Sequence, residues 1–168
     1  MSNSDHYDDA PNATAKDTRS ARTITSRAVT VNKPVSEVFA FFRDLSNAPL
    51  YMEDVESVTL AGTTARWTGT HGSWESEITH EVPEKEFSWQ AEDSAGRATF
   101  AEIAGRGTVV TLTMAYEQGY LAKVIDKLTQ NDPGIRARRD LRRFKQLLET
   151  GEIATNARNR RMLAEEKN

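Results

Sequence analysis

Hydrophobic residues recur with two different periods along this chain, and the changes of period predict its architecture. Between residues 55 and 116 they occupy alternate positions, which is the period of strands buried on one face. Before and after this stretch they recur at intervals of three and four residues, as in amphipathic helices. The pattern therefore predicts a strand-rich body flanked by helices.

The clearest helix is predicted between Asp132 and Gly151. Asp132 suits the N-cap, Pro133 suits the first turn, and Gly151 suits the position after the last turn. One side of this helix is apolar and the opposite side is basic. The apolar residues are Ala137, Leu141, Phe144, Leu147 and Leu148, and the basic residues are Arg136, Arg138, Arg139, Arg142, Arg143 and Lys145. The apolar stripe needs a partner, and the strand-rich body can supply it.

One strand and two short helices are predicted before the alternating region. Thr23–Val31 is rich in β-branched residues, which favour strands. Pro34 suits the start of a helix over Val35–Arg43. The stretch Asp44–Met52, which Pro49 interrupts, indicates a second short helix or a turn.

Six strands and one further helix are predicted after these elements. The turns between the strands are too short for parallel crossovers, so we expect an antiparallel meander. The strands are Val55–Ala61, Ala65–Thr70, Ser73–Val82, Phe87–Glu92, Ala98–Ala104 and Val109–Tyr116. A helical period returns over Gly119–Gln130.

These elements predict an α+β helix-grip fold, in which seven antiparallel strands wrap around the long C-terminal helix and two short helices follow the first strand. A sheet and a helix arranged in this way leave an elongated cavity between them. The domain is expected to span residues 23–151. Residues 1–22 are polar and are expected to form a disordered tail, and residues 152–168 are expected to form a flexible one.

Composition and charge narrow the class of protein. The chain has no cysteine, which excludes disulfides and fits a reducing cytoplasm. It shows neither an apolar leader nor a membrane-spanning run, so a cytoplasmic location is expected. The net charge of −3 combines an acidic region, residues 23–104, with a basic region, residues 105–168. A charge asymmetry of this size usually serves solubility.

Several segments carry a resemblance to a known superfamily. They are Val29-Thr-Val-Asn-Lys-Pro-Val-Ser-Glu-Val38, Phe42-Arg-Asp-Leu-Ser-Asn-Ala-Pro49, Met52-Glu-Asp-Val-Glu-Ser-Val58, Trp74-Glu-Ser-Glu-Ile-Thr79, Trp89, Gly107-Thr-Val109 and Leu141-Arg-Arg-Phe-Lys-Gln-Leu-Leu-Glu-Thr-Gly-Glu152. In these segments the chain resembles the SRPBCC or START-like superfamily, and within it the bacterial polyketide cyclase/dehydrase and coenzyme-Q-binding START branch. The resemblance implies the helix-grip fold. It leaves the activity open, because the superfamily includes cyclases, lipid carriers and quinone binders.

Aromatic, methionine and aliphatic residues are the candidates for lining the cavity of such a fold. The same residue types fill ordinary cores, and that is the alternative for each of them. The candidates are Phe42, Tyr51, Met52, Trp67, Trp74, Ile78, Trp89, Phe100, Leu112, Met114, Leu141 and Phe144. A register error of one residue would invert each strand face.

His80 is the candidate for a catalytic residue. Alternation places it in phase with Trp74 and Ile78, where an inward imidazole can act as a general acid or base. The alternative is that His80 has no catalytic role and that its ring nitrogens form hydrogen bonds in the core or at the rim of the cavity. His71 lies beside Gly72 and is expected in an exposed turn. The histidines are scattered, so we expect no metal site, and no cofactor is indicated.

Three functions remain open at this point. The leading hypothesis is the binding or transport of a hydrophobic small molecule, such as a lipid, an isoprenoid quinone or a polyketide. The second is a polyketide aromatase/cyclase or dehydrase that acts on a poly-β-ketone in the same cavity. The third is a protein-interaction or stress-related module that uses the basic side of the C-terminal helix, although a solvated face that also pairs with the acidic body is the favoured explanation of that side. No nucleic-acid partner is expected, and transient membrane contact is left open.

Overall fold

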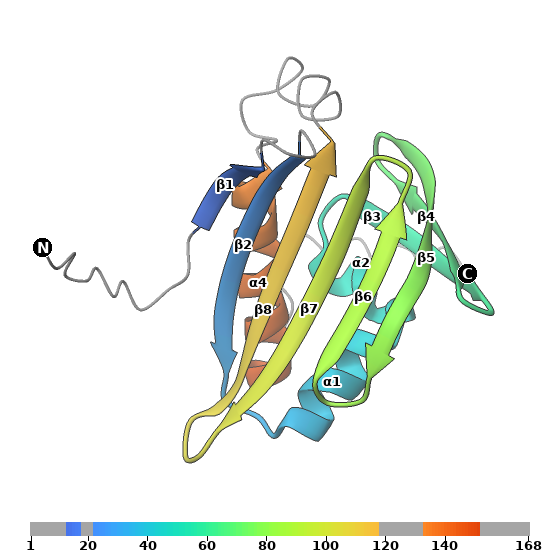
Figure 1. Cartoon of the computed structure of the whole chain (residues 1–168). Coiled ribbons are helices and arrows are strands. Elements are labelled where there is room, and N and C mark those ends of the chain that lie inside the picture. Colours follow the sequence, from blue (N-terminus) through green and yellow to red (C-terminus); the bar gives the residue numbers. More distant parts are fainter. Residues whose placement is uncertain (1–12, 18–21, 118–132, 152–168) are drawn as a thin grey trace, which may run out of the picture.

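The computed structural model describes residues 13–17, 22–117 and 133–151 (Figure 1). The strands are β1 (Ala13–Asp17), β2 (Arg22–Val31), β3 (Val55–Ala61), β4 (Thr64–Gly69), β5 (Gly72–Val82), β6 (Glu86–Ala91), β7 (Ser94–Ile103) and β8 (Gly107–Glu117). The helices are α1 (Val35–Arg43), the 3-10 helix η1 (Leu45–Asn47), α2 (Ala48–Tyr51) and α4 (Pro133–Thr150).

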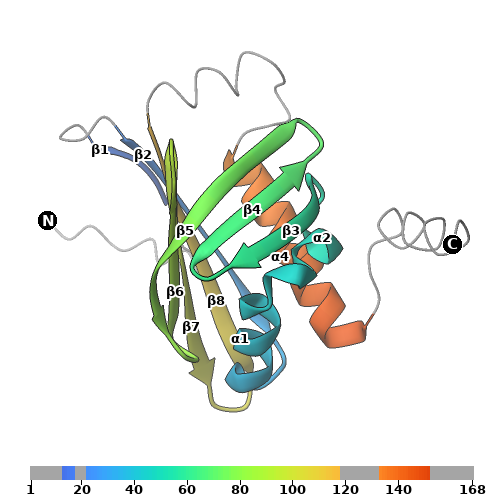
Figure 2. The same cartoon turned by 90° about the vertical axis from the view of Figure 1, so that its right-hand side faces the viewer.

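The strands form one antiparallel sheet in the order β1-β2-β8-β7-β6-β5-β4-β3. Strands β3 to β8 form a meander, and β2 joins it by pairing with β8, so that Arg22 lies opposite Glu117 and Val31 lies opposite Thr108. The sheet curves, and α4 crosses its inner face while α1 and α2 lie at another part of that face (Figure 2). This is the α+β helix-grip fold that the sequence predicts.

Most predicted elements are present, with differences at their ends. The helix over Val35–Arg43 is confirmed, and Pro34 precedes it as its N-cap. The stretch Asp44–Met52 contains η1 and α2, and α4 ends at Thr150. The helix predicted over Gly119–Gln130 lies outside the described residues.

One prediction about the N-terminal tail is wrong. The segment Ala13–Asp17 is not disordered but forms β1, an eighth strand that pairs with β2 in the register Ala13 to Ser26. Its polar sequence carries no strand pattern, because the pairing uses backbone groups that the edge of β2 would otherwise leave free. Residues 1–12 and 18–21 of that tail, and the C-terminal tail from residue 152, lie outside the described residues.

A hydrophobic core fills the end of the sheet next to α1. Phe42 of α1 packs edge to face against Phe100 of β7 and Phe144 of α4, with ring centroids 5.4 and 6.0 Å apart. Val31, at the end of β2, and Val110, near the start of β8, are almost fully buried beside them. Because this end is packed with side chains, any cavity on the inner face has to lie toward the other end of the strands.

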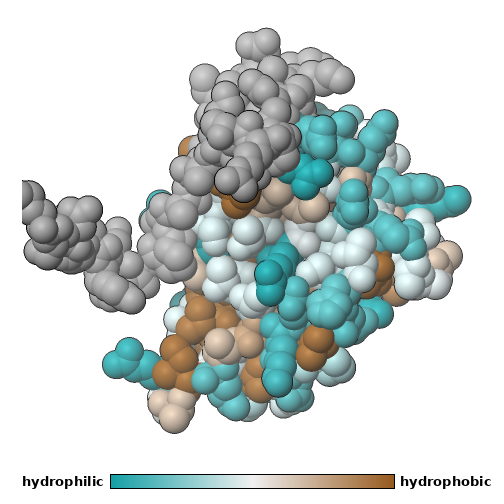
Figure 3. Space-filling model, in the orientation of Figure 1, coloured by the Kyte–Doolittle hydropathy of each residue, from teal (hydrophilic) through white to brown (hydrophobic). Residues whose placement is uncertain are grey.

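The outer face of the sheet is largely hydrophilic. Figure 3 views this face, and teal and pale residues predominate on its described part. Charged side chains pair there, as in the contact of 2.7 Å between Arg97 and Glu86. The alternation of strands β4 to β8 therefore directs apolar side chains inward, toward α4.

Candidate functional site

A cavity of about 200 Å³ lies between the inner face of the sheet and α4. Its residues come from α1, η1, α2 and the segment after it, strands β4 to β8, and the first three turns of α4. They are Phe42, Leu45, Tyr51, Met52, Trp67, Trp74, Ser76, Ile78, Phe87, Trp89, Ala91, Ser94, Leu112, Met114, Tyr116, Arg136, Ala137, Asp140, Leu141 and Phe144. Most of these side chains are apolar or aromatic, as in sites that bind hydrophobic small molecules.

The structure brings together all but one of the residues predicted for the cavity. The exception is Phe100, which lies in the core against Phe39, with ring centroids 5.2 Å apart. Phe100 has the inward orientation that alternation predicts. It lies too far along β7, however, opposite Val110 rather than opposite the cavity residue Met114.

Two tryptophans form one wall of the cavity. Trp67 of β4 and Trp74 of β5 are directly paired across the strands, and their rings are parallel, with centroids 5.9 Å apart. The indole N–H of Trp67 donates a hydrogen bond of 2.9 Å to the hydroxyl of Ser76, which fixes the orientation of that ring. Trp74 remains 42% exposed. The cavity therefore reaches the surface at this tryptophan.

The ring of the third tryptophan, Trp89, occupies space beside a glycine of the neighbouring strand. Trp89 of β6 is paired with Gly96 of β7. A Cβ atom at Gly96 would lie 2.1 Å from ring atoms of Trp89, so no larger residue fits there without moving the indole. This contact fixes the position of the Trp89 ring, which lines the cavity.

A carboxyl group is buried within this largely apolar surface. Asp140 of α4 lines the cavity and is only 7% exposed. The backbone N–H of Glu53 donates a hydrogen bond to its carboxylate. Burial raises the pKa of Asp140 to about 7, and nearby Asp54 adds to the increase, whereas Arg139, the Glu53 N–H and Arg136 oppose it. Asp140 can therefore gain or lose a proton near neutral pH.

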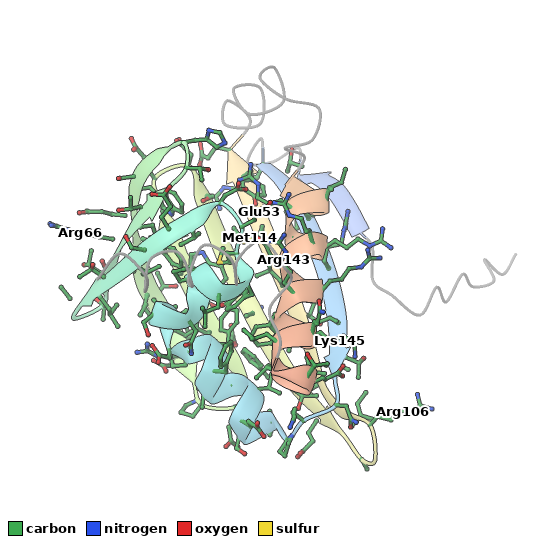
Figure 4. All side chains as sticks on the ribbon, turned by 180° about the vertical axis from the view of Figure 1, so that it is seen from behind. Glu53, Arg66, Arg106, Met114, Arg143 and Lys145 are labelled. Atoms are coloured by element: carbon green, nitrogen blue, oxygen red, sulfur yellow. The ribbon has the colours of Figure 1, made fainter. Side chains whose placement is uncertain are left out.

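Arginines of α4 pair with two acidic residues after α2. Arg136 lies 3.2 Å from Asp54, Arg139 lies 2.8 Å from Glu53, and Arg143 lies 3.7 Å from Glu53. Figure 4 shows Glu53 and Arg143 close together where this segment meets α4, whereas Arg66 and Arg106 extend away from the body.

These ion pairs correct the prediction that all the helix arginines lie opposite the apolar stripe. Arg136 lines the cavity, whereas Arg138 and Arg142 are exposed. The turn after α2 brings acidic residues against the near side of α4. Helical periodicity within α4 cannot show this contact.

Tyr51 of α2 is a second polar group beside Asp140. Its ring packs edge to face on Phe144, with centroids 5.0 Å apart, and it is 6% exposed. Burial, together with the negative charge of Asp140, raises the pKa of Tyr51 above its ordinary value. The phenol therefore stays protonated at neutral pH and can donate a hydrogen bond.

The prediction that His80 faces the cavity is wrong. The pairing of β5 with β6 shifts between Ile78 and His80, so Thr79 is an extra residue at a β-bulge. Beyond the bulge the phase is inverted: His80 pairs with Ser88, on the outer face, and its side chain is 58% exposed. Its nearest acid is Glu86, at 3.8 Å. His80 therefore cannot serve as the acid or base of this cavity.

The remaining predictions concern an exposed histidine, metals and membranes. His71 lies in an exposed turn, as predicted. Within the described ranges, no group of three or more His, Asp or Glu side chains is arranged to hold a metal ion. None of the described helices is long and apolar enough to cross a lipid bilayer.

Sequence reasoning missed Asp140, although a signal for it exists. At 100° per residue, Asp140 projects between Leu147 and Phe144 around the helix axis, beside the apolar stripe. A carboxylate at that position in an amphipathic helix has to be buried or paired. The arginines on both sides of it in the sequence obscure this signal.

Comparison with known proteins identifies relatives of the chain. Residues 22–149 match the family model described as polyketide cyclase/dehydrase and lipid transport. A search of curated proteins finds none that matches. Among solved structures, DR_A0006 from Deinococcus radiodurans is 31% identical over 77% of this chain and 100% of its own, with a TM-score of 0.59.

Two more distant structures share the fold. CalU16 from Micromonospora echinospora is 14% identical, and the match covers 94% of each chain with a TM-score of 0.60. BexL, a di-domain ARO/CYC protein from the BE-7585A biosynthetic pathway, is 16% identical with a TM-score of 0.60. The BexL match covers 79% of this chain and 52% of BexL.

The raised pKa of Asp140 leads to a prediction about stability. In the unfolded chain the carboxyl ionises near 3.8, whereas the folded protein keeps the proton up to about pH 7. The folded state binds more protons between these values, so its stability falls as the pH rises. We expect wild-type protein to lose about 2 kcal/mol more unfolding free energy than Asp140→Asn between about pH 5 and about pH 8.

Urea unfolding at the two pH values measures this difference. Asp93→Asn is the matched control, because Asp93 is an exposed aspartate in the turn before β7, near the same end of the sheet. The control should follow the wild type. Equal pH dependence of the wild type and Asp140→Asn would contradict the assignment.

Proposed function

Because this chain belongs to the polyketide cyclase/dehydrase and lipid transport family, we propose that its cavity binds a hydrophobic small molecule. The observation that carries the proposal is the combination of an apolar cavity with aromatic walls. Trp67, Trp74 and Trp89 all line it, and Trp74 reaches the surface. A ligand in this cavity gains about 25 cal/mol for each Å² of apolar surface removed from water.

The rigidity of the walls favours a planar ligand over a flexible one. The hydrogen bond from Trp67 to Ser76 and the contact between Trp89 and Gly96 hold two of the rings in place. A preorganised aromatic surface binds planar rings by stacking and loses little conformational entropy. The preferred ligand is therefore an aromatic or polycyclic molecule rather than a long acyl chain.

A polyketide cyclase or dehydrase is the second candidate function, and Asp140 is the observation that favours it. A cavity carboxyl with a pKa of about 7 has the property required of a general base at neutral pH. In a cyclisation, the Asp140 carboxylate would remove a proton from a methylene between two carbonyls. The resulting enolate carbon would form a bond to another carbonyl carbon, and the proton would return to that carbonyl's oxygen. The family description and the ARO/CYC relative BexL also agree with this reaction class.

An interaction module that uses the basic side of α4 has less support. Arg136, Arg139 and Arg143 pair within the protein with Glu53 and Asp54. Arginines that already have carboxylate partners contribute little to the binding of another anion. Of the six basic residues predicted on this side of α4, only Arg138 and Arg142 are exposed.

Filling the cavity tests the binding proposal. Ala91 lines the cavity at the end of β6, so Ala91→Phe should occupy part of it and weaken the binding of methylnaphthalene by about tenfold or more. Tryptophan fluorescence quenching measures the affinity. Ala101→Phe is the matched control, because Ala101 is exposed on β7. The absence of binding to the wild type, or unchanged binding to Ala91→Phe, would contradict the proposal.

Turnover of a poly-β-ketone tests the second candidate. Asp140→Asn keeps the size of the side chain but removes its proton-transfer capacity, so cyclisation should slow by about 100-fold or more. Product formation by mass spectrometry measures the rate, with Asp93→Asn as the control. If Asp140→Asn remains folded and forms product at the wild-type rate, Asp140 does not transfer the proton.

A further inference from the structure

The cavity contains a hydrogen-bond acceptor that the protein leaves largely unused. We propose that the Asp140 carboxylate selects ligands whose polar group is a hydrogen-bond donor, an amine or a hydroxyl, and that the cavity discriminates against carboxylic acids of the same shape. This inference rests on the proposed function, since it concerns the ligand that the cavity binds. The carboxylate would distinguish between hydrophobic ligands that have different polar groups, which apolar burial alone cannot do.

The hydrogen bonding of Asp140 is the first observation behind this inference. Within the described part of the chain, its Oδ1 is buried and accepts no hydrogen bond. The nearest arginine contact of Oδ1 is Arg139 Nε, at 3.8 Å, which is too long for a hydrogen bond. An ionised carboxylate only accepts hydrogen bonds, so a ligand donor is the group that matches it.

The charge balance around Asp140 is the second observation. Arg136 and Arg139 already have partners in Asp54 and Glu53, at 3.2 and 2.8 Å. With Arg143 included, three cations face three carboxylates when Asp140 is ionised. A ligand carboxylate would add a fourth negative charge to three cations, which is costly away from water, even though the Nε atoms of Arg136 and Arg139 make no hydrogen bond within the described residues.

The aromatic surroundings favour an amine in particular. Tyr51 and Phe144, whose rings contact each other, line the cavity together with Asp140. An ammonium ion next to such rings gains cation–π attraction in addition to its hydrogen bond with the carboxylate. A hydroxyl gains only the hydrogen bond. The expected order of affinity is amine, then hydroxyl, then carboxylic acid.

The protonation of Asp140 makes this selection depend on pH. The groups around it are Tyr51 of α2, Glu53 and Asp54 of the following segment, Arg136 and Arg139 of α4, and Tyr116 of β8 across the cavity. Burial raises the pKa of Asp140 to about 7. A donor ligand favours the ionised carboxylate, so its affinity should rise as the pH rises through 7. A carboxylic acid should show the opposite trend.

Four probes with one ring system test the inference: methylnaphthalene, naphthylmethylamine, naphthylmethanol and naphthoic acid. Their affinities for the full chain are measured by tryptophan fluorescence quenching at about pH 6 and about pH 8. At the higher pH the amine should bind about tenfold or more tightly than the acid, and it should lose about tenfold in affinity at the lower pH. In Asp140→Asn the preference for the amine should disappear, whereas Asp93→Asn should keep it.

Each outcome supports or overturns a distinct claim. If naphthoic acid binds at about pH 8 as tightly as the amine, or if Asp140→Asn keeps the wild-type preference, the selection by Asp140 is wrong while hydrophobic binding stands. If none of the probes binds, methylnaphthalene included, the proposed function itself fails. Should Asp140→Asn not fold, the pH dependence of the wild type with the amine and the acid decides between these results.

Discussion

The burial of the apolar stripe of α4 against a curved sheet is the constraint on which the rest of this structure depends. Leu141 and Phe144 have to leave water, and so do the inward side chains of the strands. Phe42 and Phe100 complete this packing at the end of the sheet next to α1. Toward the other end the helix and the sheet do not fill the space between them. A cavity is the consequence of that geometry.

The same helix also carries the electrostatics of the cavity. Asp140 lies beside the apolar stripe, so packing the stripe against the sheet also buries a carboxyl, and burial raises its pKa to about 7. The flanking arginines stay near the surface and pair with Glu53 and Asp54, which ties α4 to the segment after α2. One element thus supplies both an apolar wall of the cavity and its buried carboxyl group. The binding and the proton transfer that we propose would both use this arrangement.

Periodicity was sufficient to predict strands β2 to β8, the main helix and eleven of the twenty residues that line the cavity, because both periods reflect burial on one face. It failed where a single residue changes the phase. The bulge at Thr79 turns His80 outward, and no feature of the alternating pattern marks it. The cavity also depends on position along a strand, which separates Phe100 from Met114 although both face inward. The position of Asp140 beside the apolar stripe indicates its burial, but its interactions with Glu53 and Asp54 depend on the tertiary fold.

The central claim is that Asp140 is a proton-exchanging acceptor inside an apolar, aromatic cavity. Carbon NMR of its carboxyl group, followed through a pH titration with and without naphthylmethylamine, measures this most directly. Our account predicts a pKa of about 7 in the free protein and a decrease of about one unit or more when the amine is bound. A carboxyl that titrates in the free protein near the ordinary value of 3.8, or whose pKa does not respond to the bound amine, would contradict it.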